Sequence, residues 1–202
     1  MTTESRILPL RHWRRFALLA MVLGACTLMP PALLEWSRSG LQSYEYWRLL
    51  TGHWVHLGAE HLALNLAGLA IIGLLFRRHP PLTVWVAFLL ISPVLISLGL
   101  LWLVPDLVWY RGFSGALHGL LVYTALFNLS TERRWSLLVL AVVSLKLALE
   151  NLVYGHSAEN SFIGGRVIQQ AHGLGALIGA LAGLLPILAR KLFRKPAKSS
   201  LV

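Results

Sequence analysis

The sequence has 202 residues, of which 56% are hydrophobic and 13% are charged, with a mean hydropathy of +0.66. A soluble domain carries about a quarter charged residues, so this composition excludes an ordinary soluble protein. The formal charge of +10 could indicate a nucleic-acid-binding protein. The Lys and Arg residues stand in short clusters between long apolar runs, however, and this arrangement excludes that class.

Six apolar segments are long enough, or nearly so, to cross a bilayer, whose hydrocarbon core of about 30 Å takes about 20 helical residues. The sequence therefore predicts an all-α membrane protein with six transmembrane helices, preceded by a tail over 1–15 and followed by a basic tail over 190–202. The first segment follows basic residues, as in a signal peptide, but prolines rather than a small-residue cleavage site come after it, so we interpret it as a retained anchor. The predicted spans are 16–34, 61–76, 82–104, 113–129, 135–153 and 167–189, which make one membrane domain over 16–189.

The distribution of positive charge predicts which side of the membrane each connection faces. Thirteen of the 18 Lys and Arg residues fall in the two tails and in the short connections 77–81 and 131–134, whereas four fall in the other three connections. We therefore expect both termini in the cytoplasm, and we expect the second, fourth and sixth spans to start at the outer face. The long outer connection, 35–60, is rich in Trp and Tyr, whose rings favour the headgroup level. We expect it to lie in the interface as short helical pieces.

Polar residues inside a bilayer are costly and mark function by default. Four such residues lie near the beginnings of the three spans that start at the outer face: His61 and Asn65 in the second, Ser114 in the fourth and His172 in the second turn of the sixth. Because the three spans share an orientation, we expect these side chains at a similar depth although they are far apart in sequence. This coincidence predicts a catalytic site close to the outer face.

Ser114 opens its span between Gly112 and Gly115, two residues that permit tight backbone geometry and the close approach of another chain. Backbone N–H groups at a helix start lack partners and lie at the positive end of the dipole, where they can stabilise an oxyanion. A helix from Ser114 to Leu129 would measure about 24 Å, less than the hydrocarbon core, so we expect Ser114 below the membrane surface in a cavity that water reaches. The alternative is a serine that only caps the helix.

His172 could be the base that a serine nucleophile needs, because imidazole titrates near neutral pH. It precedes a ridge of glycines that runs from Gly175 to Gly183 in steps of four, and the serine span offers Gly115 and Gly119 as a match. Helices packed through glycine would bring the hydroxyl and the imidazole within hydrogen-bonding distance. The alternative is a histidine that merely bonds a backbone carbonyl.

His61 and Asn65 are four residues apart and therefore share one helix face. Both could donate hydrogen bonds to an oxyanion, together with the Ser114 amide. The alternative is a polar pair that bridges water between helices. A zinc site is not expected, because the sequence has no His-Glu-x-x-His motif and no aspartate inside a predicted span.

Three other polar residues in the spans, His118, Lys146 and Glu150, each allow more than one interpretation. His118 shares a helix face with Ser114 and could be the base, a support for the base or a structural donor. We favour support, since a side chain on the same helix points roughly parallel to the serine. Lys146 and Glu150 are four apart on the fifth span, and we interpret them as an ion pair in which each neutralises the other. The alternative is that they line an entrance near the outer end of that helix.

These motifs resemble the signature regions of the rhomboid protease family, and the resemblance covers about residues 15 to 190. The Tyr46-Trp47-Arg48 run resembles the Trp-Arg element of the family's first external loop. The three signature regions correspond to Gly112-Phe113-Ser114-Gly115, to Ala171-His172-x-x-Gly175-x-x-x-Gly179, and to His61-x-x-x-Asn65 preceded by His56.

The resemblance implies an intramembrane serine endopeptidase with Ser114 and His172 as a catalytic dyad and no acidic third member. It also implies an oxyanion hole made of His61, Asn65 and the Ser114 amide, with Arg48 as a structural residue of the interfacial loop. The residues themselves give no reason to expect a carboxylate that orients His172. No cofactor and no metal are implied.

One position departs from the family pattern, since typical rhomboids carry, four residues after the nucleophile, a tyrosine that packs on the catalytic histidine. The residue here is His118. With the short chain and the Ser-Gly-x-x-His-Gly run, this resembles the rhombosortase branch, whose members process secreted proteins that end in a Gly-Gly motif, a transmembrane helix and a basic tail.

The expected partners are accordingly a membrane-anchored protein substrate and the lipid bilayer, without nucleic acid, in a bacterial inner membrane. Water would release the acyl-enzyme in a hydrolase, whereas an amine would do so in a transferase. The alternatives are a general rhomboid protease acting on single-span proteins and a non-catalytic rhomboid-like protein that binds membrane clients. A small transporter would show internal repeats with interrupted helices, which the sequence lacks.

Overall fold

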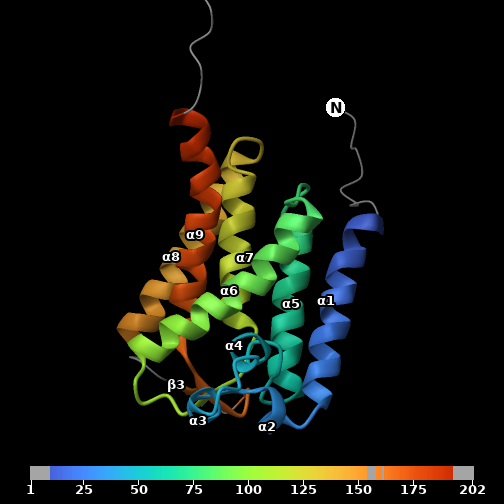
Figure 1. Cartoon of the computed structure of the whole chain (residues 1–202). Helices are drawn as coiled ribbons and strands as arrows, with labels where there is room; N and C mark the ends of the chain where they lie inside the picture. Colours follow the sequence, from blue (N-terminus) through green and yellow to red (C-terminus); the bar gives the residue numbers. More distant parts are fainter. Residues whose placement is uncertain (1–9, 154–157, 161, 193–202) are drawn as a thin grey trace, which may run out of the picture.

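The computed structural model describes residues 10–153, 158–160 and 162–192, so residues 1–9 and 193–202 of the two predicted tails lie outside the described residues. Long helices form a bundle, and short helices and two strand pairs gather at one end of it (Figure 1). The helices are α1 (Leu10–Leu28), α2 (Pro31–Leu34), α3 (Arg38–Gln42), α4 (Arg48–Thr51), α5 (Ala59–Leu75), α6 (Leu82–Leu103), α7 (Ser114–Phe127), α8 (Arg133–Val153) and α9 (Gln169–Leu192). The strands are β1 (Trp36–Ser37), antiparallel to β2 (Trp109–Tyr110), and β3 (Ala158–Asn160), antiparallel to β4 (Gly165–Val167).

Each of the six apolar segments overlaps one long helix, but several boundaries differ from the prediction. The first helix starts earlier, at Leu10, and ends at Leu28, because the prolines at 30 and 31 cannot continue it. The last helix starts at Gln169, since β4 occupies the residues before it. The connection 35–60 contains the short helices α3 and α4, as expected, whereas the two strand pairs were not predicted.

The helix surfaces suit contact with lipid. By length and composition, α6 and α8 (over Arg133–Leu152) are the described helices that can cross a membrane, while α5 and α7 are apolar but shorter. The long helices expose many large apolar side chains, a surface that soluble proteins rarely present. Examples are Leu18 and Met21 on α1, Ile71 and Leu74 on α5, Val142 and Leu145 on α8, and Leu181 and Leu185 on α9. The six-span topology with cytoplasmic termini stays a prediction.

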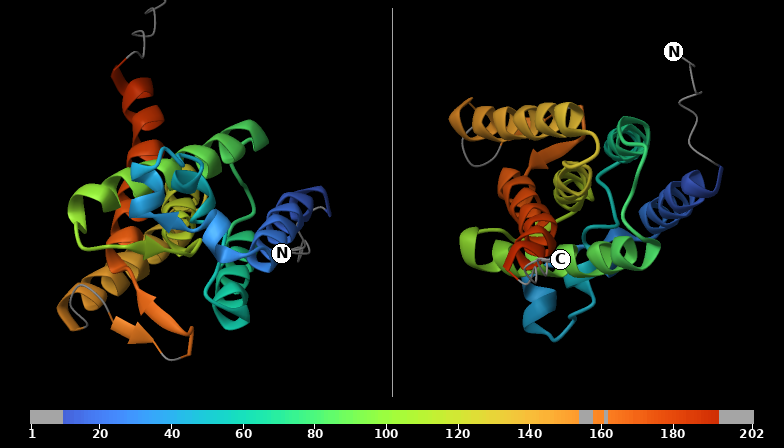
Figure 2. Two further views of the ribbon diagram at one scale, coloured as in Figure 1. Left: turned by 60° about the horizontal axis from the view of Figure 1, so that its bottom comes forward. Right: turned by 90° about the horizontal axis from the view of Figure 1, so that it is seen from above.

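Helix α7 lies at the centre of the bundle and contacts α5, α6, α8 and α9 (Figure 2). Its side chains Ala116, Leu120 and Tyr123 are buried in a core that also contains Ile96 and Leu100 of α6. Helices α5, α7 and α9 all begin at the end of the bundle that carries the short helices (Figure 1). The starts of these three helices, where the sequence places its polar residues, are therefore brought to one end of the molecule.

Helices α7 and α9 pack through glycine backbone. A Cβ atom on Gly119 would lie 2.5 Å from the carbonyl oxygen of Gly175, and a Cβ on Gly175 would overlap the carbonyl group of Gly115. The predicted glycine ridge makes this contact, except that Gly183 meets the side chain of Leu126, 2.7 Å from its Cβ. Because only glycine leaves room here, the backbones approach closely and hold the starts of α7 and α9 together.

The connection between α1 and α5 is tied together by buried polar side chains. Arg48 is 7% exposed, donates to the Glu35 carbonyl at 2.9 Å and pairs with Glu45, which fits the structural role that the resemblance implies. His53 lies 3.0 Å from the hydroxyl of Ser97 on α6. Burial lowers the pKa of His53 to about 3, so the ring is neutral and serves as a structural hydrogen-bonding group.

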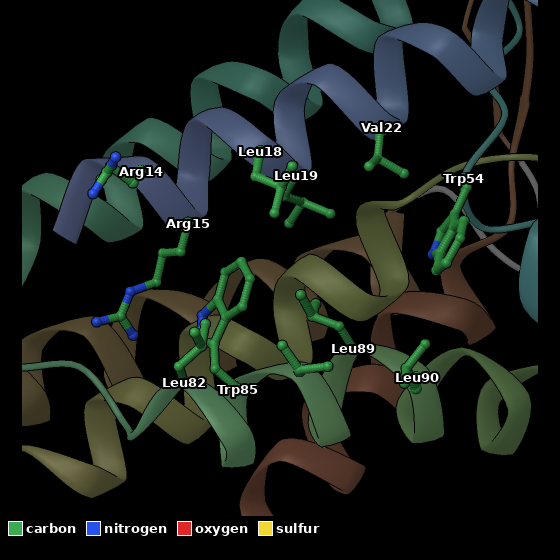
Figure 3. Close-up of a pocket in the computed structure, with 11 residues that line it drawn as sticks. Arg14, Arg15, Leu18, Leu19, Val22, Trp54, Leu82, Trp85, Leu89 and Leu90 are labelled. Carbon is green, nitrogen blue, oxygen red and sulfur yellow. The ribbon is translucent and has the colours of Figure 1, made fainter. Parts of the chain in front are cut away.

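A cavity of about 620 Å³ lies between α1 and α6 (Figure 3). Its walls are mainly aliphatic, for example Leu19 of α1 and Leu89 of α6, with Arg14 and Arg15 at one end and Trp54 at the other. The residues that line this cavity supply no nucleophile and no base, so the cavity is not suited to hydrolysis.

Candidate active site

Ser114 is the first residue of α7, and the turn before it is held in an unusual backbone conformation. Gly112 has a φ of +137°, a value that side-chain-bearing residues rarely adopt. The hydroxyl of Tyr110 donates to the Gly112 carbonyl at 2.7 Å, and burial raises the pKa of this phenol, so the donor stays protonated. Phe113, which is fully buried, takes the capping position of the helix. The alternative interpretation of Ser114 as the helix cap is therefore wrong.

The Ser114 hydroxyl lies beside the imidazole of His172, with 2.9 Å between Oγ and Nε2. His172 is the fourth residue of α9 and so lies in its first turn, not in the second as predicted, because the helix starts later. The glycine contact between α7 and α9 makes this short distance possible. A neutral imidazole accepts through one ring nitrogen, so the hydroxyl can donate to Nε2, which is the arrangement of a serine nucleophile and its base.

A carboxylate lies on the other side of the same ring, which corrects the expectation that none is placed to orient His172. The Glu150 oxygens lie 3.2 and 3.1 Å from His172 Nδ1. Glu150 also pairs with Lys146, as predicted, and both residues line the cavity at Ser114, which was the alternative. The ion pair is thus present, the entrance role stays a prediction, and the contact with His172 is a further feature.

His118 stacks on His172, with 4.3 Å between ring centroids and 17° between ring planes. Its Nδ1 lies 2.7 Å from the carbonyl oxygen of Ser114, and since a carbonyl only accepts, Nδ1 carries the hydrogen. That hydrogen bond ties the His118 ring to its own helix and leaves its flat face against the face of His172. The geometry favours a supporting role over that of the base.

His61 packs against the backbone just before the serine. Its Cε1 lies 2.8 Å from the position that a Cβ on Gly112 would occupy, so only glycine fits there. The Leu57 amide donates to His61 Nδ1 at 3.4 Å, which leaves Nε2 as the nitrogen that carries the hydrogen in the neutral ring. Asn65 donates one amide hydrogen to the His61 carbonyl at 2.9 Å and keeps a second one. Both side chains thus retain a donor.

One cavity of about 340 Å³ brings these groups together from four helices. Each helix contributes polar side chains to a wall that is otherwise mainly apolar, and Tyr110, Arg111 and Arg166 come from the connections. The helical residues concerned are His61 and Asn65 of α5, Ser114 and His118 of α7, Lys146 and Glu150 of α8, and His172 of α9. A nucleophile, a base and two spare donors around one cavity are the parts that acyl transfer requires.

A family model for the rhomboid domain matches residues 43–188. The chain belongs to the rhomboid family. Rhomboid proteins are membrane-embedded serine proteases that act on membrane protein substrates within the bilayer. All the residues of the cavity lie inside the matched region. No curated protein matches the chain significantly.

Sequence reasoning missed two parts of this rhomboid site. One is Glu150 at His172: the predicted topology places Glu150 near the outer end of its span, at the depth of Ser114 and His172, but it does not indicate that Glu150 faces them. The other is Tyr110, which steadies the Gly112 turn. Spacing gives no signal for Tyr110, since its role depends on the path of an irregular connection.

Proposed function

We propose that this rhomboid protein is an active serine endopeptidase in which Ser114 is the nucleophile and His172 is the base. The observation that carries the proposal is the 2.9 Å distance between Ser114 Oγ and His172 Nε2 at the edge of a cavity. His172 Nε2 takes the hydroxyl proton as Oγ attacks the scissile carbonyl carbon, and the tetrahedral intermediate expels the amine, which leaves with that proton. Water, deprotonated by His172, then attacks the acyl-enzyme and releases the new carboxyl terminus.

The negative oxygen of the intermediate is placed, in this proposal, among the Ser114 amide, the His61 ring and the Asn65 side-chain amide. The amide of the first residue of a helix has no partner within the helix, and both side chains keep a hydrogen to donate. Gly112 and Gly115 leave space beside Ser114 for the ring of His61 and for α9.

Replacing the side-chain donors tests this oxyanion site. We expect His61→Ala and Asn65→Ala each to lower kcat by about 10²- to 10³-fold with a smaller change in KM, because the donors act most strongly on charge that develops in the transition state. Steady-state kinetics on a purified substrate check this. Values of kcat within about threefold of wild type for both variants would assign the two residues to structure only.

The proposed topology has six spans with both termini in the cytoplasm, so that the site opens toward the outer face. The start of α1 and the end of α9 lie at the same end of the bundle, opposite the short helices (Figure 1), and basic residues are concentrated in these two segments. Helix α7, with 14 residues, is about 21 Å long, which would leave Ser114 below the membrane surface.

The proposed substrate is a secreted protein held in the membrane by a C-terminal anchor with a Gly-Gly motif, as in the rhombosortase branch. The feature that supports this branch is His118, which stacks on His172 where the typical family member has a tyrosine.

The experiment for this substrate is co-expression with a candidate that ends in Gly-Gly, a transmembrane helix and a basic tail. Wild type is compared with Ser114→Ala and with Ser130→Ala, an exposed serine outside the cavity, as the control. Release of the substrate by wild type and Ser130→Ala, with retention by Ser114→Ala, is the expected result. Equal release by Ser114→Ala would contradict the proposed function. Release of a single-span protein without Gly-Gly, together with retention of the Gly-Gly protein, would instead favour the general rhomboid protease.

The mass of the released protein separates hydrolysis from transfer. Hydrolysis leaves a free carboxylate at the new C-terminus, and we expect this mass. An added amine-containing group would show that an amine, and not water, resolves the acyl-enzyme.

A further inference from the structure

Glu150 occupies a place that helix stability does not explain. It lies in the last turn of α8, where the negative end of the helix dipole disfavours a carboxylate, and in an apolar helix that lipid is expected to surround. Its ion pair with Lys146 has the lysine four residues before the glutamate, which is the weaker order for helix stability. We therefore expect a contact outside α8 to stabilise the carboxylate at this position.

That contact is with His172. The Glu150 side chain is 16% exposed and the His172 side chain 7%, whereas that of Lys146 is 45% exposed. Glu150 thus turns away from solvent toward the ring, and both of its oxygens lie within 3.2 Å of Nδ1. A carboxylate only accepts hydrogen bonds, so Nδ1 carries the hydrogen.

The hydrogen on Nδ1 determines what the opposite nitrogen can do. In the neutral imidazole the other nitrogen, Nε2, then has a lone pair, and it is Nε2 that lies 2.9 Å from Ser114 Oγ. His172 therefore donates to Glu150 through Nδ1 and accepts from Ser114 through Nε2, which is the protonation state that a base needs before it takes the serine proton. His118 holds the face of the same ring and leaves its two nitrogens to Glu150 and Ser114.

We propose that Glu150 is a positioning residue that converts the Ser114–His172 dyad into a functional triad. Its carboxylate accepts the Nδ1 hydrogen, fixes the tautomer and the ring orientation, and stabilises the imidazolium formed when Nε2 takes the serine proton. No proton passes to Glu150, which stays ionised throughout. Lys146, which is the more exposed partner of the ion pair, offsets the charge of Glu150 but does not contact the ring. This inference rests on the proposed function, since it assigns a role within the same reaction.

Glu150→Gln tests the inference, because it keeps the size of the side chain but removes the charge and can stabilise the wrong tautomer. An amide in place of the triad carboxylate lowers kcat by about 10⁴-fold in serine proteases that depend on it, and because His118 also supports the ring here, we expect about 10²-fold. KM should stay within about twofold, since Glu150 acts on the base and not on substrate binding. A serine-reactive phosphonofluoridate should label Ser114 more slowly by a similar factor.

Two matched variants and a stability measurement separate positioning from structure. Asn151→Ala, next to Glu150 in the same turn, should leave kcat unchanged, since its side chain is exposed and donates to the Leu147 carbonyl of its own helix. Lys146→Met removes the ion pair but keeps the carboxylate at His172, so kcat should fall by less than about threefold, as expected for a partly exposed pair. Glu150→Ala is a second test that should lower kcat at least as much as Glu150→Gln, and each thermal midpoint is measured alongside.

The failures of the two proposals are distinguishable. If Ser114→Ala is inactive but Glu150→Gln has the wild-type kcat, the positioning role is overturned and the proposed function is retained. A loss of equal size in Lys146→Met and Glu150→Gln would also overturn it, because the ion pair alone would then explain the effect. Cleavage by Ser114→Ala at the wild-type rate would overturn the proposed function itself.

Discussion

Ser114→Ala and His172→Ala are each expected to lower kcat for substrate cleavage by at least about 10⁴-fold. The two side chains act as one unit, since the hydroxyl is a weak nucleophile until Nε2, 2.9 Å away, removes its proton. The activity of the double variant should therefore lie within about threefold of that of either single variant. The measurement is single-turnover cleavage of a purified transmembrane substrate in detergent or in vesicles.

His118→Phe is the matched control for His172→Ala. A phenyl ring can keep the stack on His172 but offers no base and no hydrogen bond to the Ser114 carbonyl. We expect it to keep a kcat far above that of His172→Ala. Loss of activity in His118→Phe, with normal activity in His172→Ala, would instead identify His118 as the base.

Gly175→Ala is expected to lower both activity and stability. A Cβ at this position meets the carbonyl group of Gly115, so α9 has to move away from α7, and that movement separates His172 from Ser114. Overpacking of this kind costs roughly 1–3 kcal/mol of unfolding free energy. A displacement of the base by about 1 Å costs about 10²-fold in rate, so we expect kcat to fall by that factor.

Gly173→Ala is the matched control, because it lies in the same helix and a Cβ there meets nothing within 4 Å. We expect wild-type activity and an unchanged thermal midpoint for this variant. If Gly175→Ala also had wild-type kcat and an unchanged midpoint, close glycine packing would not be what joins the two halves of the dyad.

The pairing of Ser114 with His172 could be predicted from the sequence because the membrane topology indicates the depth of each residue in the bilayer. Spans that start at the same face place their first residues at one depth, and the glycine spacing indicates which helices touch. Both inferences need only helix direction and small-residue periodicity, which the sequence carries directly. The placement of Ser114 at the start of α7 follows from the same reasoning.

The contact of Glu150 with His172 could not be predicted in this way, because it depends on how α8 is rotated about its axis. Because α8 is apolar on most sides, its sequence does not determine that rotation. In addition, an ion pair with Lys146 was enough to explain the charge of Glu150. The β1–β2 pair was missed for a related reason, since it joins two irregular connections about 70 residues apart through only two residues each. Long-range pairing of short segments leaves no periodic pattern.

The most direct measurement is the mass-spectrometric site of covalent labelling by a phosphonofluoridate probe on the purified protein. An activated serine attacks the phosphorus and displaces fluoride, whereas an ordinary serine hydroxyl reacts very slowly. We predict a single adduct on the peptide that contains Ser114 in wild type, and no adduct within the same time in His172→Ala. Labelling of another residue, or equal labelling of Ser114 in His172→Ala, would contradict the assignment of these two residues as nucleophile and base.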